Sequence, residues 1–72
     1  MEFKLVNSSN LSAAAYEDGH LYLQFHHGGT YCYPDVPLHV FDDLLAAPSV
    51  GRYFHAEIRN KYPFQKIDII AV

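Results

Sequence analysis

The chain has 72 residues, of which 50% are hydrophobic and 15% aromatic, so one domain with a compact core is the expected organisation. The formal net charge of -3 argues against a protein that coats nucleic acid through electrostatics alone, and no apolar run is long enough to cross a membrane. The single cysteine, Cys32, excludes an internal disulfide, and since the N-terminus has no signal-peptide pattern we expect a cytoplasmic protein.

Charge is unevenly distributed along the chain. Residues 1–51 contain one basic residue, Lys4, and six acids, which is a net charge of -5. Residues 52–72 contain four basic residues and two acids, which is a net charge of +2. The C-terminal part could therefore bind an anion, although four cations are also typical of an ordinary solvated surface.

The N-terminal half predicts an antiparallel meander. Residues 3–7 alternate weakly and favour a first strand, and residues 8–10 favour a turn or bulge. Residues 11–16 form a second strand despite three alanines, and Asp18-Gly19 is a hairpin turn signal. Residues 20–26 then alternate cleanly, which predicts a strand with one buried face.

Gly28-Gly29 can adopt positive φ and return the chain antiparallel into residues 30–33, which Pro34 ends because proline lacks a backbone donor. A two-residue loop would place Tyr31 and Tyr33 on the outer face, as an exposed aromatic platform. A three-residue loop would set Phe25 opposite Tyr31. Leu23 would then lie opposite Tyr33, and we favour this second register because two large rings fill so small a core.

Two helices follow. Pro37 suits a first helical turn, Asp35 lies close enough to help cap it, and Pro48 closes the helix. Its apolar stripe consists of Val40, Phe41, Leu44 and Leu45. Ser49 is the expected N-cap of a second helix that runs to residue 60, with Val50, Phe54 and Ile58 on its apolar side.

The second helix also carries positive charge. Arg52, His55 and Arg59 fall within roughly 60° of one another on a helical projection and lie away from Phe54, so they predict an exposed cationic stripe. Tyr62-Pro63 ends this helix. The isoleucines that follow suggest a last short strand that rejoins the sheet or pairs with another chain; they are Ile67, Ile69 and Ile70.

These elements predict an α+β fold. We expect a three- or four-stranded antiparallel, meander-like sheet with two C-terminal helices packed on one face. Residues 1–72 form a single domain, in which residues 65–72 are a hydrophobic tail and a possible extra strand.

The cationic stripe is the leading candidate for a binding site. Arg52 and Arg59 are two helical turns apart, about 10 Å, which matches separate phosphates of a strand better than one phosphate. His55 and Lys61 are further phosphate-binding candidates. A neighbouring tyrosine could stack a base, and the candidates are Tyr22 and Tyr53.

Catalysis and metal binding are not expected. Five histidines occur, but no Cys pair, HExxH motif or carboxylate triad supports them as ligands. Cys32 has no local activating base, and Ser8 and Ser9 lack a GxSxG context. We therefore expect a protein that is not an enzyme, with no metal and no cofactor.

Several short motifs occur in an ordered series: Ser8-Ser9-Asn10-Leu11, then Leu21-x-Leu-x-Phe-x-x-Gly-Gly-x-Tyr-x-Tyr33, Val36-Pro37, and Ala47-Pro-Ser-x-Gly-Arg-Tyr-Phe54 with Ile58-Arg59. In this series the chain resembles the KTSC domain, over residues 6–64. That family is named after a C-terminal segment of some lysyl-tRNA synthetases and also occurs as small free-standing bacterial and phage proteins. The residues 67–72 lie beyond the family pattern.

The resemblance implies a candidate RNA-binding domain, by association with tRNA synthetases. It also implies a common pattern of residues, many of them structural: Tyr31, Tyr33, Ser49, Gly51, Arg52, Tyr53, Phe54 and Arg59. Two functional hypotheses result. The first is a non-catalytic module that binds RNA or nucleotides through the cationic helix face. The second is a protein-interaction or self-assembling module, such as a homo-oligomer that holds a small phosphorylated ligand.

Overall fold

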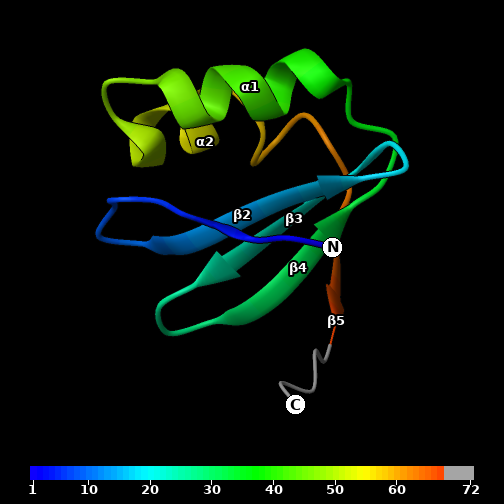
Figure 1. The fold of residues 1–72 in the computed structure, drawn as a ribbon, viewed down its shortest axis with the longest axis horizontal. Coiled ribbons are helices and arrows are strands. Elements are labelled where there is room, and N and C mark those ends of the chain that lie inside the picture. The colour runs from blue at the N-terminus through cyan, green and yellow to red at the C-terminus, as the bar shows by residue number, and fades with distance from the viewer. Residues whose placement is uncertain (68–72) are drawn as a thin grey trace.

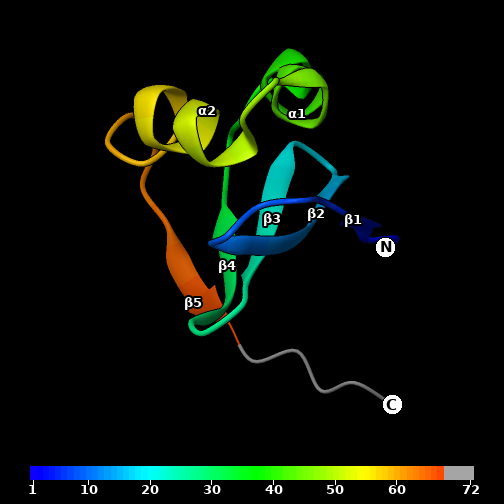
Figure 2. The same cartoon turned by 90° about the vertical axis from the view of Figure 1, so that its left-hand side faces the viewer.

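A five-stranded sheet carries both helices on one face (Figures 1 and 2). The computed structural model describes residues 1–67. Its elements are β1 (Lys4–Leu5), β2 (Leu11–Glu17), β3 (His20–Phe25), β4 (Gly29–Tyr33), α1 (Leu38–Ala46), α2 (Val50–Glu57) and β5 (Gln65–Ile67). Every strand pairs antiparallel with its neighbours, in the order β1-β2-β3-β4-β5. The expected α+β meander is confirmed, with five strands where we predicted three or four.

The pairing of β3 with β4 decides which face the tyrosines of β4 occupy. Leu23 pairs with Tyr31, across a loop formed by residues 26–28, and Phe25 pairs with Gly29. The expected pairing of Phe25 with Tyr31 is therefore wrong by two residues. A shift of two leaves every side chain on its face, so the prediction that the tyrosines share the core face with Leu23 is confirmed.

Two turns adopt the left-handed backbone conformation. Asp18 and Gly19 have φ values of 54° and 81°, as the hairpin signal predicts. In the second hairpin only Gly29 has a positive φ, of 82°, whereas we expected it of Gly28 as well. The backbone N–H of His26 donates to the carbonyl of Asn10 at 2.9 Å, so residue 26 bonds to the loop before β2 rather than to β4. The loop therefore has the three residues that we expected, but it begins at residue 26 and not at residue 27.

The core lies between the sheet and the helices. Leu11, Leu21, Leu23, Leu44 and Ile58 are fully buried there, and their burial supplies the main stabilisation of so short a chain. The three alanines of β2 are buried as well, with exposed fractions of at most 2%. Their small side chains let neighbouring elements approach the strand closely, which offsets their weak β propensity.

The caps of the two helices differ. At α1 the N-cap is Pro37 and no side chain caps the helix, so the expected role of Asp35 is wrong: Asp35 lies earlier, in a turn with a φ of 59°. At α2 the side chain of Ser49 accepts a hydrogen bond from the backbone N–H of Arg52 at 3.3 Å, as predicted.

The second helix is shorter than expected. It ends at Glu57 rather than at residue 60, because Ile58 leaves the helical region, with φ of -121° and ψ of -51°. The N–H of Arg59 then donates to the carbonyl of Phe54, five residues back, at 2.9 Å. Arg59 therefore lies in the turn after the helix, and this turn sets its direction.

The chain returns to the sheet through β5, which pairs with β4 and covers its outer edge. Ile67 lies opposite Thr30, so the prediction of a last strand is confirmed for residues 65–67. Ile69 and Ile70, which we also expected in it, lie outside the described residues. Within residues 1–67, neither helix has the length and apolarity required to span a membrane.

Candidate functional site

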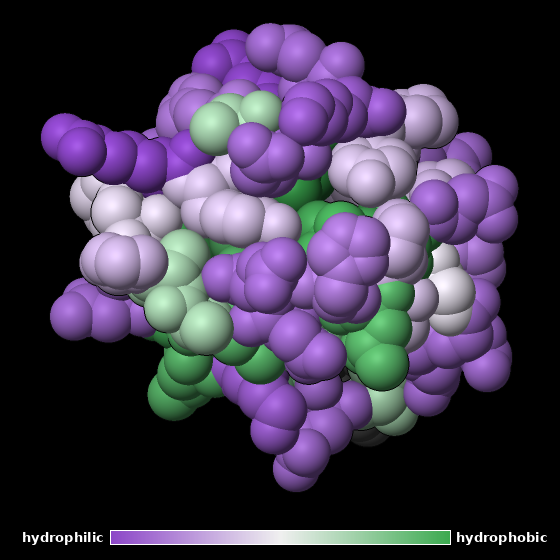
Figure 3. Space-filling model, turned by 90° about the horizontal axis from the view of Figure 1, so that it is seen from above, coloured by the Kyte–Doolittle hydropathy of each residue, from purple (hydrophilic) through white to green (hydrophobic). Residues whose placement is uncertain are grey.

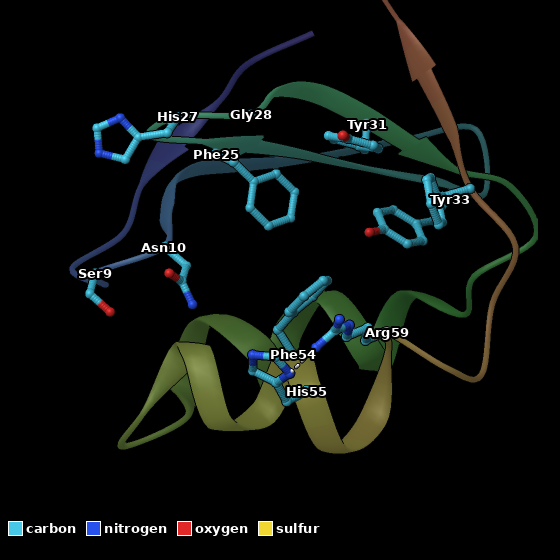
Figure 4. Close-up of a pocket in the computed structure, with 11 residues that line it drawn as sticks. Ser9, Asn10, Phe25, His27, Gly28, Tyr31, Tyr33, Phe54, His55 and Arg59 are labelled. Carbon is cyan, nitrogen blue, oxygen red and sulfur yellow. Dashed lines mark hydrogen bonds between the residues drawn. The ribbon is translucent and has the colours of Figure 1, made fainter.

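A cavity of about 380 Å³ opens between α2 and the end of the sheet where β3 turns into β4 (Figure 4). Five aromatic rings line it, and we call it the aromatic cavity. They come from four separate parts of the chain: Phe25 on β3, Tyr31 and Tyr33 on β4, Phe54 on α2 and Phe64 before β5. The volume is in the range of small-molecule pockets in proteins.

The five rings form a closed circuit of contacts. Successive ring centroids, in the order Phe25, Tyr31, Phe64, Tyr33, Phe54 and back to Phe25, lie between 5.2 and 6.3 Å apart, and four of the five contacts are edge-to-face. These are the separations and orientations at which aromatic pairs attract. Each ring is thus held by two others, so the apolar wall is already formed without a ligand.

Tyr33 is the most buried of the polar-tipped rings in this wall, with 3% of its surface exposed. Burial raises the pKa of its phenol to about 12, and the neighbouring Tyr31 adds to this effect while Arg59 opposes it. Its hydroxyl points into the space between the sheet and α2 (Figure 4). It is therefore a neutral hydrogen-bonding group inside an aromatic wall.

Positive charge reaches the cavity through Arg59. Its side chain lies beside that of His55, and Nη1 of Arg59 is 3.1 Å from Nδ1 of His55 (Figure 4). Both residues are exposed, as the cationic stripe predicts. Within residues 1–67 no carboxylate lies within 4.0 Å of Arg52 or Arg59, so both guanidinium groups are available to an anion.

Ser9 and Asn10 close the opposite end of the cavity, in the loop between β1 and β2. The hydroxyl of Ser8 accepts hydrogen bonds from the backbone N–H groups of Asn10 and Leu11, and Nε2 of His26 lies 3.0 Å from the carbonyl oxygen of Ser8. These bonds hold the loop against the β3–β4 hairpin. The side chain of Asn10 points toward α2 (Figure 4).

A second hollow, the Arg52 depression, adjoins the aromatic cavity. Ser9, Asn10 and His55 line both, and the depression continues past them to Arg52 and Gly51 at the start of α2. Neither hollow has an aspartate or glutamate among its described lining residues. In a chain of net charge -3, this continuous surface is thus lined by cations, neutral polar groups and aromatic rings.

Hydrophilic side chains cover most of the face that carries both helices (Figure 3), and the groove between α1 and α2 is lined by charges of both signs. It is lined by two basic residues, Arg52 and Lys61, by two acidic residues, Asp43 and Glu57, and by Tyr53. Nζ of Lys61 lies 3.0 Å from the carboxylate of Glu57, and this hydrogen bond raises the pKa of Lys61. The pKa of Tyr53 is raised mainly by burial, and then by Asp43 and Glu57. Both candidates therefore lie in a mixed-charge groove outside the aromatic cavity.

Tyr22 lies on the other face of the sheet. It alternates with the buried Leu21 and Leu23 and pairs with Cys32, so it points away from both helices. Partial burial raises its pKa, and Cys32 adds to this effect. Tyr22 is consequently remote from Arg52 and Arg59, and the structure does not bring these candidates together.

The structure thus divides the residues that the sequence singled out. Those in the aromatic cavity or the Arg52 depression are Arg52, His55, Arg59, Tyr31, Tyr33, Ser49, Gly51 and Phe54. Phe25, Phe64 and Asn10 were missed as site residues. A core-facing ring such as Phe25 gives no sequence signal for a cavity, whereas Pro63-Phe64 after a helix could have drawn attention as an aromatic residue in a connecting segment. Within residues 1–67, no three His, Cys, Asp or Glu side chains converge as metal ligands.

The chain is similar to KTSC domain proteins in both sequence and structure. The KTSC domain family profile matches residues 7–62. A protein of Tsukamurella paurometabola is 44% identical over 59 residues, which cover 79% of this chain and 88% of that protein. The lysine–tRNA ligase of Trichormus variabilis is 40% identical over 47 residues, which cover 65% of this chain and 8% of the ligase. The crystal structure of a KTSC domain protein from Yersinia pestis superposes with a TM-score of 0.89 at 33% identity, covering 93% of this chain and 97% of that one.

Proposed function

The chain belongs to the KTSC domain family, and we propose that it is a non-catalytic module that binds RNA or nucleotides. The observation that carries this proposal is that no aspartate or glutamate among residues 1–67 lines the aromatic cavity or the Arg52 depression. Aromatic rings stack bases, and guanidinium groups bind phosphates. The lysine–tRNA ligases that share a segment with this chain act on tRNA by name, which supports an RNA ligand.

Electrostatics support the same ligand class. An exposed guanidinium beside a pocket without carboxylates attracts anions even when the net charge of the chain is negative, because screening limits the effect of charges more than about 10 Å away. Most of the acids belong to residues 1–51, outside the lining of either hollow. A nucleotide presents both a flat base and a phosphate, and this surface offers aromatic rings for the one and guanidinium groups for the other.

Titration with a short single-stranded RNA, at about 50 mM and about 200 mM salt, tests the proposal. We expect saturable binding at low salt that weakens at high salt. Arg59→Ala should weaken binding and reduce the salt slope by about one phosphate contact. Lys4→Ala is the matched control, because it removes one positive charge from β1, outside both hollows. No binding of wild-type protein at low salt would overturn the proposal.

A second candidate function, self-assembly, is favoured by the edge strand β1. Leu5 on this two-residue strand is 89% exposed, and edge strands can pair with another chain. Light scattering over a range of concentrations tests it. Assembly should be concentration-dependent and should be reduced by Leu5→Lys, because a charged edge disfavours pairing. A wild-type protein that stays monomeric at every concentration would rule this function out.

A further inference from the structure

Resting on the proposed function, we infer that the site binds single-stranded RNA as at least two successive nucleotides. One nucleotide places its base in the aromatic cavity and its phosphate beside Arg59, and the phosphate of the next nucleotide occupies the Arg52 depression. A free mononucleotide would fill the first position only. The inference deepens the proposed function by naming the form of the ligand and the residue, Arg52, that distinguishes an oligonucleotide from a mononucleotide.

The continuity of the two hollows is the first observation. Both are lined by Ser9, Asn10 and His55, so a ligand that leaves the aromatic cavity on this side enters the Arg52 depression directly. The cavity has a wall of Phe and Tyr rings. The depression has no Phe or Tyr among its described lining residues, which are small or polar and include Arg52 and His55. The first hollow therefore suits a base, and the second suits backbone groups.

The separation of the two guanidinium groups is the second observation. Arg52 lies in the first turn of α2 and Arg59 in the turn that follows the helix, so most of α2 lies between their backbones. Arg59 is directed to the cavity by its contact with His55, whereas Arg52 lines only the depression and the groove between the helices. The two cations thus serve different positions along a strand, rather than one phosphate.

Neutral polar groups lie between these positions. The amide of Asn10 and the hydroxyl of Ser9 stand at the junction of the two hollows, where each can donate and accept a hydrogen bond. A ribose 2′-hydroxyl offers the same two capacities, and it is the group by which a protein distinguishes RNA from DNA. A base can reach the ring-lined cavity only when it is unstacked, which selects single strands over duplexes.

The test compares ligands of increasing length by fluorescence or calorimetric titration at low salt. The probes are a nucleoside monophosphate, a tetranucleotide RNA, the DNA of the same sequence and the corresponding RNA duplex. We expect the RNA tetranucleotide to bind about ten-fold more tightly than the monophosphate, and more tightly than the DNA or the duplex. Equal affinity of monophosphate and tetranucleotide would overturn the two-position site while leaving the proposed function intact.

Substitutions test whether Arg52 binds the phosphate in the Arg52 depression. Arg52→Ala should remove the advantage of the tetranucleotide and change monophosphate affinity by less than about two-fold. Lys61→Ala is the matched control, because Lys61 is ion-paired to Glu57 and lies outside both hollows. An equal loss with Lys61→Ala, or a loss of monophosphate binding with Arg52→Ala, would overturn the inference.

Gly51 provides a steric test that retains all charges. A Cβ at this position would meet only the hydroxyl of Ser8, at 3.5 Å, which is an ordinary contact. Because a Cβ is accommodated and leucine favours the helix more than glycine does, we expect Gly51→Leu to fold, and its unfolding midpoint in urea checks this. Its side chain would occupy the Arg52 depression. Retention of the tetranucleotide advantage by this folded variant would contradict the inference, whereas failure of every probe to bind the wild type would contradict the proposed function itself.

Discussion

Arg59 donates a hydrogen bond from Nη1 to Nδ1 of His55 at 3.1 Å, beside the aromatic cavity. Guanidinium nitrogens only donate, so Nδ1 of His55 must accept and the proton of the neutral imidazole is on Nε2. His55 lies four residues earlier, on the last turn of α2, and so links the direction of Arg59 to the helix. His55 thereby acts as a positioning residue for the cation in the proposed function.

This pairing makes His55→Leu and His55→Gln informative variants. The leucine variant removes the acceptor and should weaken RNA binding about five-fold, which corresponds to about 1 kcal/mol for a lost hydrogen bond. The glutamine variant keeps a side-chain acceptor and should lose less. Titration with the same RNA measures both. In an Arg59→Ala background His55→Leu should cost little more, and full additivity of the two losses would contradict the positioning role.

Because the pKa of Tyr33 is raised, we expect the protein to lose stability at alkaline pH. An unfolded tyrosine ionises near pH 10, whereas burial raises the pKa of Tyr33 to about 12 in the folded protein. The folded state therefore retains this proton more strongly, and the stabilisation that is present below about pH 10 is lost as the pH rises toward 12. Urea unfolding from about pH 9 to about pH 12 should show this decline, and Tyr33→Phe should reduce it. The other five tyrosines are unchanged, so an equal decline in both proteins would contradict the assignment.

Substitution of Gly19 should lower the free energy of unfolding through backbone conformation alone. Its φ is 81°, and a Cβ at this position would meet no atom within 4 Å. Gly19→Ala should therefore destabilise the protein by about 1 kcal/mol through backbone strain alone. Gly19→Asn should cost less, because asparagine tolerates the left-handed region better. Urea unfolding compares the variants, and a neutral Gly19→Ala would show that this turn relaxes.

Leu44 and Leu38 lie on the same helix, α1, but differ in burial, so their substitutions can be compared directly. Leu44 is fully buried in the core, whereas Leu38 is 54% exposed. Leu44→Ala should lower the free energy of unfolding by about 2–5 kcal/mol, because it removes buried methyl groups and leaves a cavity. For a domain of this size such a loss approaches the total stability. Leu38→Ala should cost well under 1 kcal/mol. Similar losses for the two variants, measured in urea, would contradict the packing of α1.

The sequence was sufficient to predict the structural features that depend on a few neighbouring residues. Alternation in residues 20–25, the hairpin signal at Asp18-Gly19 and the cap at Ser49 all depend on a few neighbouring residues, and each is confirmed. The predicted exposure of Arg52, His55 and Arg59 is also confirmed, although Arg59 lies in the turn after α2 and not on the helix. Two of the failures, at the cap of α1 and the end of α2, concern boundaries, which depend on backbone dihedral angles that residue type does not determine.

By itself, the sequence determined the α+β order of elements, the buried face of residues 20–25 and the exposed cations, because side-chain periodicity sets these within a single element. Only the tertiary structure decided the pairing of β3 with β4 and the circuit of rings from Phe25 to Phe64. Rings in this circuit are as many as 39 positions apart in the chain, between Phe25 and Phe64. They meet because the helices fold back over the sheet and β5 returns beside β4, and contacts between elements so distant carry no periodic signal in the sequence.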